Sequence, residues 1–143
     1  MEVNIKILRE GVTPPVYQTL GAAGFDIASA EDIQLLPGQT GLVPTGYAVE
    51  LPIGFELQIR PRSGISLRTP IRIANAPGTI DADYRGEVGI ICTNTSDDSI
   101  IIHKGDRIAQ GVVTQYDRVF WKVTSELTET ARGAGGFGHT GTK

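Results

Sequence analysis

Two short segments carry the side chains best suited to chemistry. Residues 78–87 read GTIDADYRGE, which places a carboxylate, Asp81, and a phenol, Tyr84, on a turn bounded by glycines. Residues 132–141 read RGAGGFGHTG, which offers an arginine, an aromatic ring, an imidazole and a hydroxyl on a glycine-rich tail. A carboxylate can orient and deprotonate a water molecule, while arginine and backbone N–H groups bind phosphate oxygens. This combination suits a phosphorylated ligand that also carries an aromatic base.

Composition limits the kind of protein that holds such a site. The chain has 143 residues, the length of a single domain, so we expect 1–143 to fold as one unit. Its net charge of −3 excludes a basic surface for DNA or RNA, so an anionic ligand must be held by a few well-placed arginines or by a metal. Cys92 is the single cysteine, which excludes an internal disulfide, and its apolar neighbours predict a buried thiol. Because the sequence has no membrane-length apolar run and no signal-peptide profile at its N-terminus, we expect a cytoplasmic protein without nucleic-acid or membrane partners.

The elements that would position these side chains are predicted to be short β-strands. Apolar and polar residues alternate at 3–7 and 55–60, the period of half-buried strands. Further strands are predicted at 41–51, 71–74, 88–93, 99–103, 107–116 and 119–123. Turn residues such as Leu36-Pro37-Gly38 separate these runs at the short spacing typical of an all-β barrel or sandwich. The pattern fades from about Thr124 and becomes glycine-rich after Arg132.

Several familiar ligand-binding patterns are matched in part and excluded by their context. Residues 133–138 have the glycine spacing of a dinucleotide-binding loop, but no strand precedes them and too little chain follows for a βαβ unit. Residues 136–143 end in Gly-Thr-Lys, which is the wrong order for a P-loop. Residues 81–92 begin like an EF-hand loop but end in cysteine where the chelating glutamate belongs. The two histidines lie apart from each other and from Cys92, so a dedicated zinc site is not expected.

Five segments taken together resemble the trimeric dUTPases, the deoxyuridine triphosphate nucleotidohydrolases. They follow one another in the family's order and spacing, as AGFDI at 23–27, PRSG at 61–64, GTIDADYRGE at 78–87, GDRIAQ at 105–110 and RGAGGFGHTG at 132–141. The resemblance implies an all-β, jelly-roll-like β-barrel subunit and a homotrimer with active sites at the subunit interfaces. It also implies that residues 125–143 form a mobile tail, which closes over a neighbouring subunit's site.

The resemblance gives roles to the residues around the turn at 78–87. Asp81 would be the catalytic carboxylate, which orients the water that attacks the α-phosphorus; taken alone, it would be a turn residue that caps its own backbone. Tyr84 would pack against the deoxyribose and exclude a 2′-hydroxyl, the alternative being a half-buried strand aromatic. The uracil base would be bound by a hairpin that contains Asn75, Gly78, Thr79 and Ile80.

Phosphate binding is implied for a second group of residues. They are Arg62, Ser63, Gly64, Gln110 and Arg132, together with Gly138, His139 and Thr140 in the tail. Phe137, also in the tail, would instead fold over the base. The simpler alternatives are a plain β-turn at 61–64 and an ion pair between Arg62 and an acidic neighbour. Arg107 is expected at a subunit interface. Mg²⁺ would be coordinated by the phosphates with no direct protein ligand, and Asp26 would be a possible outer-shell partner that contacts the metal-bound water.

The predicted function is therefore Mg²⁺-dependent hydrolysis of dUTP to dUMP and pyrophosphate, which lowers dUTP and supplies dUMP for thymidylate synthesis. Two alternatives share the barrel. A dCTP deaminase, with or without diphosphatase activity, usually lacks both the block at 78–87 and the motif at 132–141. A non-catalytic nucleotide sensor would bind without turnover. A third alternative is a jelly-roll interaction domain, which would not explain the glycine-rich tail.

Overall fold

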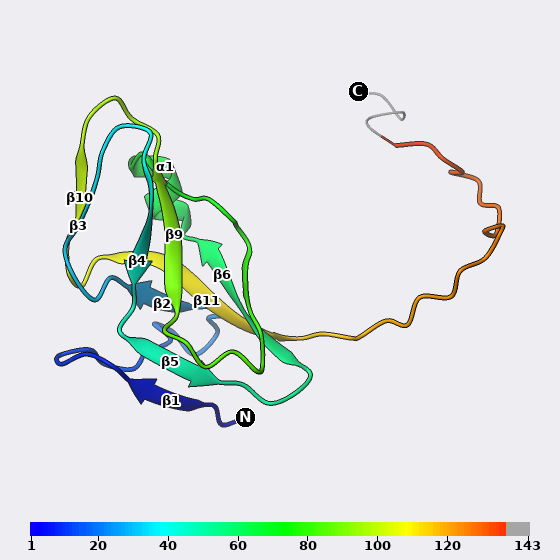
Figure 1. Cartoon of the computed structure of the whole chain (residues 1–143), viewed down its shortest axis with the longest axis horizontal. Coiled ribbons are helices and arrows are strands. Elements are labelled where there is room, and N and C mark those ends of the chain that lie inside the picture. The colour runs from blue at the N-terminus through cyan, green and yellow to red at the C-terminus, as the bar shows by residue number, and fades with distance from the viewer. Residues whose placement is uncertain (137–143) are drawn as a thin grey trace.

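The computed structural model describes residues 1–136, and β-structure dominates them (Figure 1). The elements are β1 (Asn4–Ile7), β2 (Phe25–Ala28), β3 (Ile33–Leu35), β4 (Thr40–Pro44), β5 (Tyr47–Glu50), β6 (Phe55–Pro61), α1 (Ser63–Arg68), β7 (Ile71–Ile73), β8 (Gly78–Ile80), β9 (Gly89–Asn94), β10 (Ile100–Ile102) and β11 (Arg107–Gln115). They form four antiparallel sheets, in the orders β1-β5, β10-β3, β2-β11-β6-β8 and β4-β9-β7. The all-β prediction is confirmed, although the strands form four small sheets and not one closed barrel.

The core lies between the sheets and is built by alternation within the strands. In β6, Leu57 and Ile59 point inward, and in β9 Ile90 and Cys92 do the same while Ile91 faces outward. The prediction of a buried thiol is confirmed, and burial raises the pKa of Cys92 to about 11. Asn94 is buried among these apolar groups, and its amide donates to three backbone carbonyls, so its polar atoms are satisfied.

The strand predicted over 41–51 is divided in two at Gly46. This residue has a φ of 78°, in the left-handed region that favours glycine, and a Cβ there would lie 2.5 Å from Cγ2 of Val12. The chain therefore turns between β4 and β5, which join different sheets. The prediction missed β2, β3, β8 and α1 because each is short and lacks a long alternating pattern.

The strand predicted over 119–123 is not formed. Beyond β11 the chain leaves the sheets and runs away from them, as the orange segment in Figure 1 shows. The side chains of Val119, Phe120, Trp121 and Val123 are exposed. A strand is stable only when its backbone hydrogen-bonds to a neighbour, and this segment has no such neighbour within residues 1–136.

Among residues 1–136, no helix has the length and apolar character needed to cross a membrane.

Candidate active site

Three neighbouring strands place polar residues in one row across a sheet. In the pairing of β2 with β11, Asp26 lies opposite Gln110, and in the pairing of β11 with β6, Gln110 lies opposite Arg60. Residues that lie directly opposite one another in a sheet share a face. A carboxylate, an amide and a guanidinium are therefore held side by side by the backbone ladder itself.

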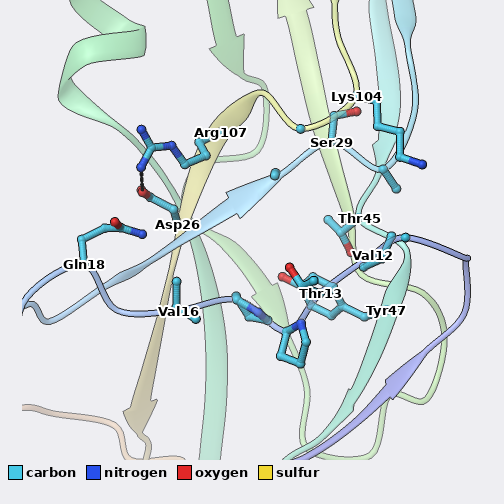
Figure 2. A pocket seen from close by; sticks show the side chains of 16 residues that line it. Val12, Thr13, Val16, Gln18, Asp26, Ser29, Thr45, Tyr47, Lys104 and Arg107 are labelled. Atoms are coloured by element: carbon cyan, nitrogen blue, oxygen red, sulfur yellow. Dashed lines mark hydrogen bonds and ion pairs between the residues drawn. The ribbon is translucent and has the colours of Figure 1, made fainter.

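Asp26 holds two arginines at one end of this row. Its Oδ1 forms an ion pair with Nε of Arg62 at 2.7 Å, and its Oδ2 accepts a hydrogen bond from Nη1 of Arg107 at 2.9 Å. Figure 2 shows Asp26 and Arg107 pointing toward each other. Arg62 also donates to the carbonyl of Arg107, which joins the segments 61–64 and 105–110 directly. One carboxylate faces two guanidinium groups, so the cluster keeps a net positive charge.

The segment 11–18 lies next to Asp26. Together with β2 and Tyr47 it encloses a cavity of about 300 Å³ next to the carboxylate (Figure 2). Tyr47 is buried there, and burial raises the pKa of its hydroxyl far above the ordinary value. The Asp26 side chain is accordingly only 14% exposed, although it lies at the edge of the sheet.

Ser63 and Gly64 follow β6 as the first two residues of α1. The short helix begins after Arg62, whose backbone is extended, and the Arg62 carbonyl accepts from the N–H of Ser66. The guanidinium of Arg68, one turn later, folds back over Gly64, and a Cβ at Gly64 would lie 2.8 Å from its Nη2. Ser63 thus lies at the end of the row, whereas the Arg68 guanidinium lies against Gly64.

Gln110 is held between two backbones. Its Nε2 donates to the carbonyl of Pro61 at 2.8 Å, and its Oε1 lies 2.8 Å from the point where a Cβ of Gly24 would stand. A Cβ at position 24 would therefore displace this amide and would also lie 3.3 Å from the carbonyl oxygen of Gly111. A shallow groove of about 590 Å³ opens in front of Gln110 and is also lined by Ser63 and by Ala76 and Pro77.

The segment that joins β7 to β8 carries the residues predicted to bind the base; β7 pairs with β9 and β8 pairs with β6, so the two strands do not form a hairpin with each other. The amide of Asn75 lies over Gly78, where a Cβ would be 3.2 Å from Nδ2 of Asn75. Gly78 is buried beside Ile59, Thr79 is exposed opposite Gln58, and Ile80 is half-buried. The structure thus brings Asn75, Gly78, Thr79 and Ile80 together on one continuous segment that leads into and forms β8.

Asp81 and Tyr84 belong to the tight turn that follows β8. The N–H of Tyr84 donates to the carbonyl of Asp81 at 3.1 Å, and the phenol of Tyr84 donates to the carbonyl of Glu87 at 3.1 Å. Asp81 is exposed and lines a cleft of about 490 Å³ together with Glu56 and Arg118. Its carboxylate therefore has access to solvent and to a ligand.

The predicted residues accordingly fall into two clusters. The arginine cluster consists of Asp26, Arg62, Ser63, Gly64 and Gln110, and the β8 cluster consists of Asn75, Gly78, Thr79, Ile80, Asp81 and Tyr84. The cleft of Asp81 contains neither Ser63 nor Gln110. Arg132 lies in the extended segment and its Nε donates to the carbonyl of Gly135, whereas Phe137, Gly138, His139 and Thr140 lie outside the described residues.

Arg60 is a residue that the sequence reasoning missed. It completes the row next to Gln110, lines the same groove as Ser63, and donates from Nε and Nη2 to the amide oxygen of Gln58. Because its partner is neutral, its positive charge is not cancelled as those of Arg62 and Arg107 are by Asp26. The alternation in 55–60 predicts that Arg60 faces outward, which was the available signal.

The family model for dUTPase matches residues 11–141, which takes in all five segments. The chain belongs to the dUTPase family. The dUTPase of Desulfotalea psychrophila, a deoxyuridine 5'-triphosphate nucleotidohydrolase, is 50% identical over 134 residues, which span 92% of this chain and 89% of the relative. As a dUTPase, the chain is an enzyme, a dUTP diphosphatase, so the predicted family and enzyme class are confirmed.

Solved dUTPase structures share the fold. The dUTPase of Staphylococcus bacteriophage 80alpha with dUpNHpp is 30% identical, covers 98% of both chains and superposes with a TM-score of 0.91. A point mutant of the dUTPase from phage phi11 of S. aureus is 26% identical, covers 90% of this chain and all of the other, and has a TM-score of 0.83. That mutant structure is described as revealing the coordination of a structural Mg(II) ion.

Proposed function

We propose that the enzyme hydrolyses dUTP to dUMP and pyrophosphate, with Mg²⁺, by attack of water on the α-phosphorus. The observation that supports this most strongly is the row of Asp26, Gln110 and Arg60, with Ser63 at its end, because the last three bring an amide, one guanidinium and a hydroxyl to one groove. Phosphate oxygens are bound by such donors. The reaction would lower dUTP and supply dUMP for thymidylate synthesis in the cytoplasm, with 1–143 acting as a single domain.

Within the arginine cluster, Ser63, Gly64 and Gln110 would donate hydrogen bonds to the phosphates. Arg62 keeps free N–H groups after its bonds to Asp26 and to the carbonyl of Arg107, so it can contact a phosphate while its position stays fixed. Pre-positioned donors of this kind stabilise the charge that develops on the phosphoryl oxygens in the transition state.

Within the β8 cluster, Asp81 would accept a proton from the attacking water and orient it. Tyr84 would pack on the deoxyribose so that a 2′-hydroxyl does not fit. The amide of Asn75 and the backbone at Gly78, Thr79 and Ile80 would match the donor and acceptor edge of uracil. Both side chains are exposed, so a ligand can reach them.

The active form would be a homotrimer, in which the β8 cluster of one subunit faces the arginine cluster of another. Two observations support this: the clusters line different cavities in one subunit, and Val119, Phe120, Trp121 and Val123 are exposed on a segment that leaves the subunit. A row of exposed large apolar side chains marks an interface. The tail at 125–143 would then close over a neighbour's site, with Arg132, Gly138, His139 and Thr140 on the phosphates and Phe137 over the base.

Mg²⁺ fits this site as an ion carried by the substrate. The donors in the groove are amide, hydroxyl and guanidinium groups, and within residues 1–136 no three His, Cys, Asp or Glu side chains gather as a metal-binding group. Asp26 could hold metal-bound water through the lone pairs that its two arginines leave free. An ion held in this way would supply charge neutralisation to the phosphates.

The activity is tested by pyrophosphate release from dUTP, dCTP, dTTP and UTP, with Mg²⁺ and after its removal by a chelator. We expect turnover of dUTP alone, and only with Mg²⁺. Asp81→Asn is expected to lower kcat by roughly 100-fold or more, because a general base contributes about that much. Asp83→Asn, a matched change in the same turn and cleft, is expected to leave kcat nearly unchanged. Equal activity of the two variants would remove Asp81 from the mechanism, and binding without turnover would indicate a sensor.

The shared site is tested by combining two inactive variants. Asp81→Asn disables the β8 cluster and Gln110→Ala disables the arginine cluster, so a site built from two subunits regains both intact clusters in some mixed trimers. Random mixing of co-expressed variants restores about one quarter of the sites if each site takes one cluster from each of two subunits. If both clusters of a site came from one subunit, co-expression would restore no activity.

A further inference from the structure

A bidentate ion pair joins the beginning of the chain to the end of the segment 78–87. Arg9, two residues after β1, donates from Nε and Nη2 to the two carboxylate oxygens of Glu87, each at 3.0 Å. The backbone N–H of Gly46 donates to the same carboxylate at 2.7 Å. Glu87 is thus fixed by three hydrogen bonds from two segments that lie far from it in the sequence, and none of the roles above uses it.

The pair is partly shielded from water, with 38% of the Arg9 side chain and 27% of the Glu87 side chain exposed. The hydrogen bonds from Arg9 are the main cause that lowers the pKa of Glu87 below its usual range. Glu87 is therefore ionised at neutral pH, and the planar fork of Arg9 fixes both its position and its orientation.

Tyr84 rests on the backbone that this pair fixes. Its phenol donates to the main-chain carbonyl of Glu87 at 3.1 Å. Its ring lies against Gly86, where a Cβ would approach to 2.5 Å from Cζ of the ring. The ring is 45% exposed, so packing in the core does not hold it. A shift of the backbone at 86–87 would therefore tilt or release the ring.

We propose that the Arg9–Glu87 pair positions the tyrosine that selects the sugar, and so sets the enzyme's discrimination between dUTP and UTP. This inference rests on the proposed role of Tyr84 against the deoxyribose. A ring held at one height leaves no room for a 2′-hydroxyl. A ring on a mobile turn can move aside and admit it. Arg9 and Glu87 are positioning residues, because they act through the backbone and Tyr84 and not on the substrate.

The measurement is kcat/KM for dUTP and for UTP in Arg9→Gln, Arg9→Lys and Glu87→Gln. We expect the ratio of the two values to fall about tenfold in Arg9→Gln and Glu87→Gln, chiefly because UTP becomes a better substrate. Arg9→Lys keeps the charge but loses the two parallel bonds, so we expect it to recover little of the ratio. Circular dichroism and sedimentation select the variants that are folded and assembled like the wild type.

Glu31→Gln is the matched control. Glu31 is the second partner of Arg9, at 3.0 Å, and it contacts neither the turn nor Tyr84. We expect this variant to keep the wild-type ratio. A fall equal to that of Glu87→Gln would overturn the proposal, because loss of any charge near Arg9 would then suffice.

The outcomes separate this inference from the proposed function. A wild type that does not hydrolyse dUTP defeats both. A wild type that hydrolyses dUTP and UTP equally well defeats the role of Tyr84 and the inference with it. A wild type that rejects UTP, together with folded Arg9→Gln and Arg9→Lys variants that reject it equally, defeats the inference alone.

Discussion

Replacing Asp26 by asparagine tests whether one carboxylate holds the arginine cluster together. Asparagine keeps one oxygen acceptor but puts an N–H₂ group against the other guanidinium. The ion pair with Arg62 at 2.7 Å is the better shielded, because only 29% of that arginine is exposed, and we expect it to contribute about 1–1.5 kcal/mol, more than a fully exposed pair. Arg107 is 53% exposed and can turn into solvent, so its bond contributes roughly 0.5–1 kcal/mol.

We therefore expect Asp26→Asn to lose about 2 kcal/mol of unfolding free energy, which corresponds to roughly 4–8 °C in Tm for a chain of this size. The assay is thermal unfolding in a chelator, at equal subunit concentration, so that neither metal binding nor assembly changes the comparison. Asp32→Asn is the control, because its side chain is 68% exposed, and we expect a change within about 1 °C. An Asp26→Asn variant with the wild-type Tm would refute the view that this carboxylate organises the two arginines.

Three further predictions concern Arg60, the tail and Cys92. Arg60→Gln is expected to raise KM for dUTP about fivefold with little change in kcat and to weaken the dependence of kcat/KM on salt, whereas Arg72→Gln, a change on another sheet, should alter neither. A chain that ends at Thr130 is expected to lose turnover while sedimenting as the full chain does, and loss of assembly would instead make the tail a structural clasp. Between about pH 9 and pH 11, the free energy of unfolding should fall more in the wild type than in Cys92→Ala. The reason is that the thiol of the unfolded chain has a pKa near 9, whereas burial raises the pKa of the folded thiol to about 11. The same pH dependence of the unfolding free energy in both proteins, measured by urea unfolding, would contradict this.

Much of the fold could be predicted from period-two alternation, because that pattern depends on which face of a strand is buried. It predicted the strands at 55–60 and 107–116 well, and these correspond to β6 and β11 at the centre of the four-stranded sheet. It failed where the backbone conformation at a single residue decides the result, as at Gly46. It failed again at 119–123, where the apolar pattern is present but the partner strand is not within the described part of the subunit.

The residues of the candidate site could be predicted from motifs, but the contacts between them could not. The sequence shows Asp26, Arg62 and Arg107 in three separate segments, and only the fold reveals that one carboxylate binds both arginines. Arg60 and Arg9 were missed for a related reason. In the sequence, each of these arginines resembles an ordinary solvated residue. Only the strand register shows that Arg60 lies beside Gln110, and only the fold shows that Arg9 binds Glu87 through two hydrogen bonds.

The four-stranded sheet positions both clusters. They can act as one site only if each is held rigidly. β6 pairs with β11 on one side, which fixes Arg60 beside Gln110, and with β8 on the other, which fixes Gly78 and Ile80 beside the core residues Ile59 and Leu57. The same strand therefore sets the position of the phosphate donors and of the base-binding segment. If the proposed trimer brings these clusters together from different subunits, a displacement of β6 would misplace both the phosphate donors and the base-binding segment of every site. That requirement gives a physical reason for anchoring the turn after β8 to distant segments through Arg9, Glu87 and Gly46.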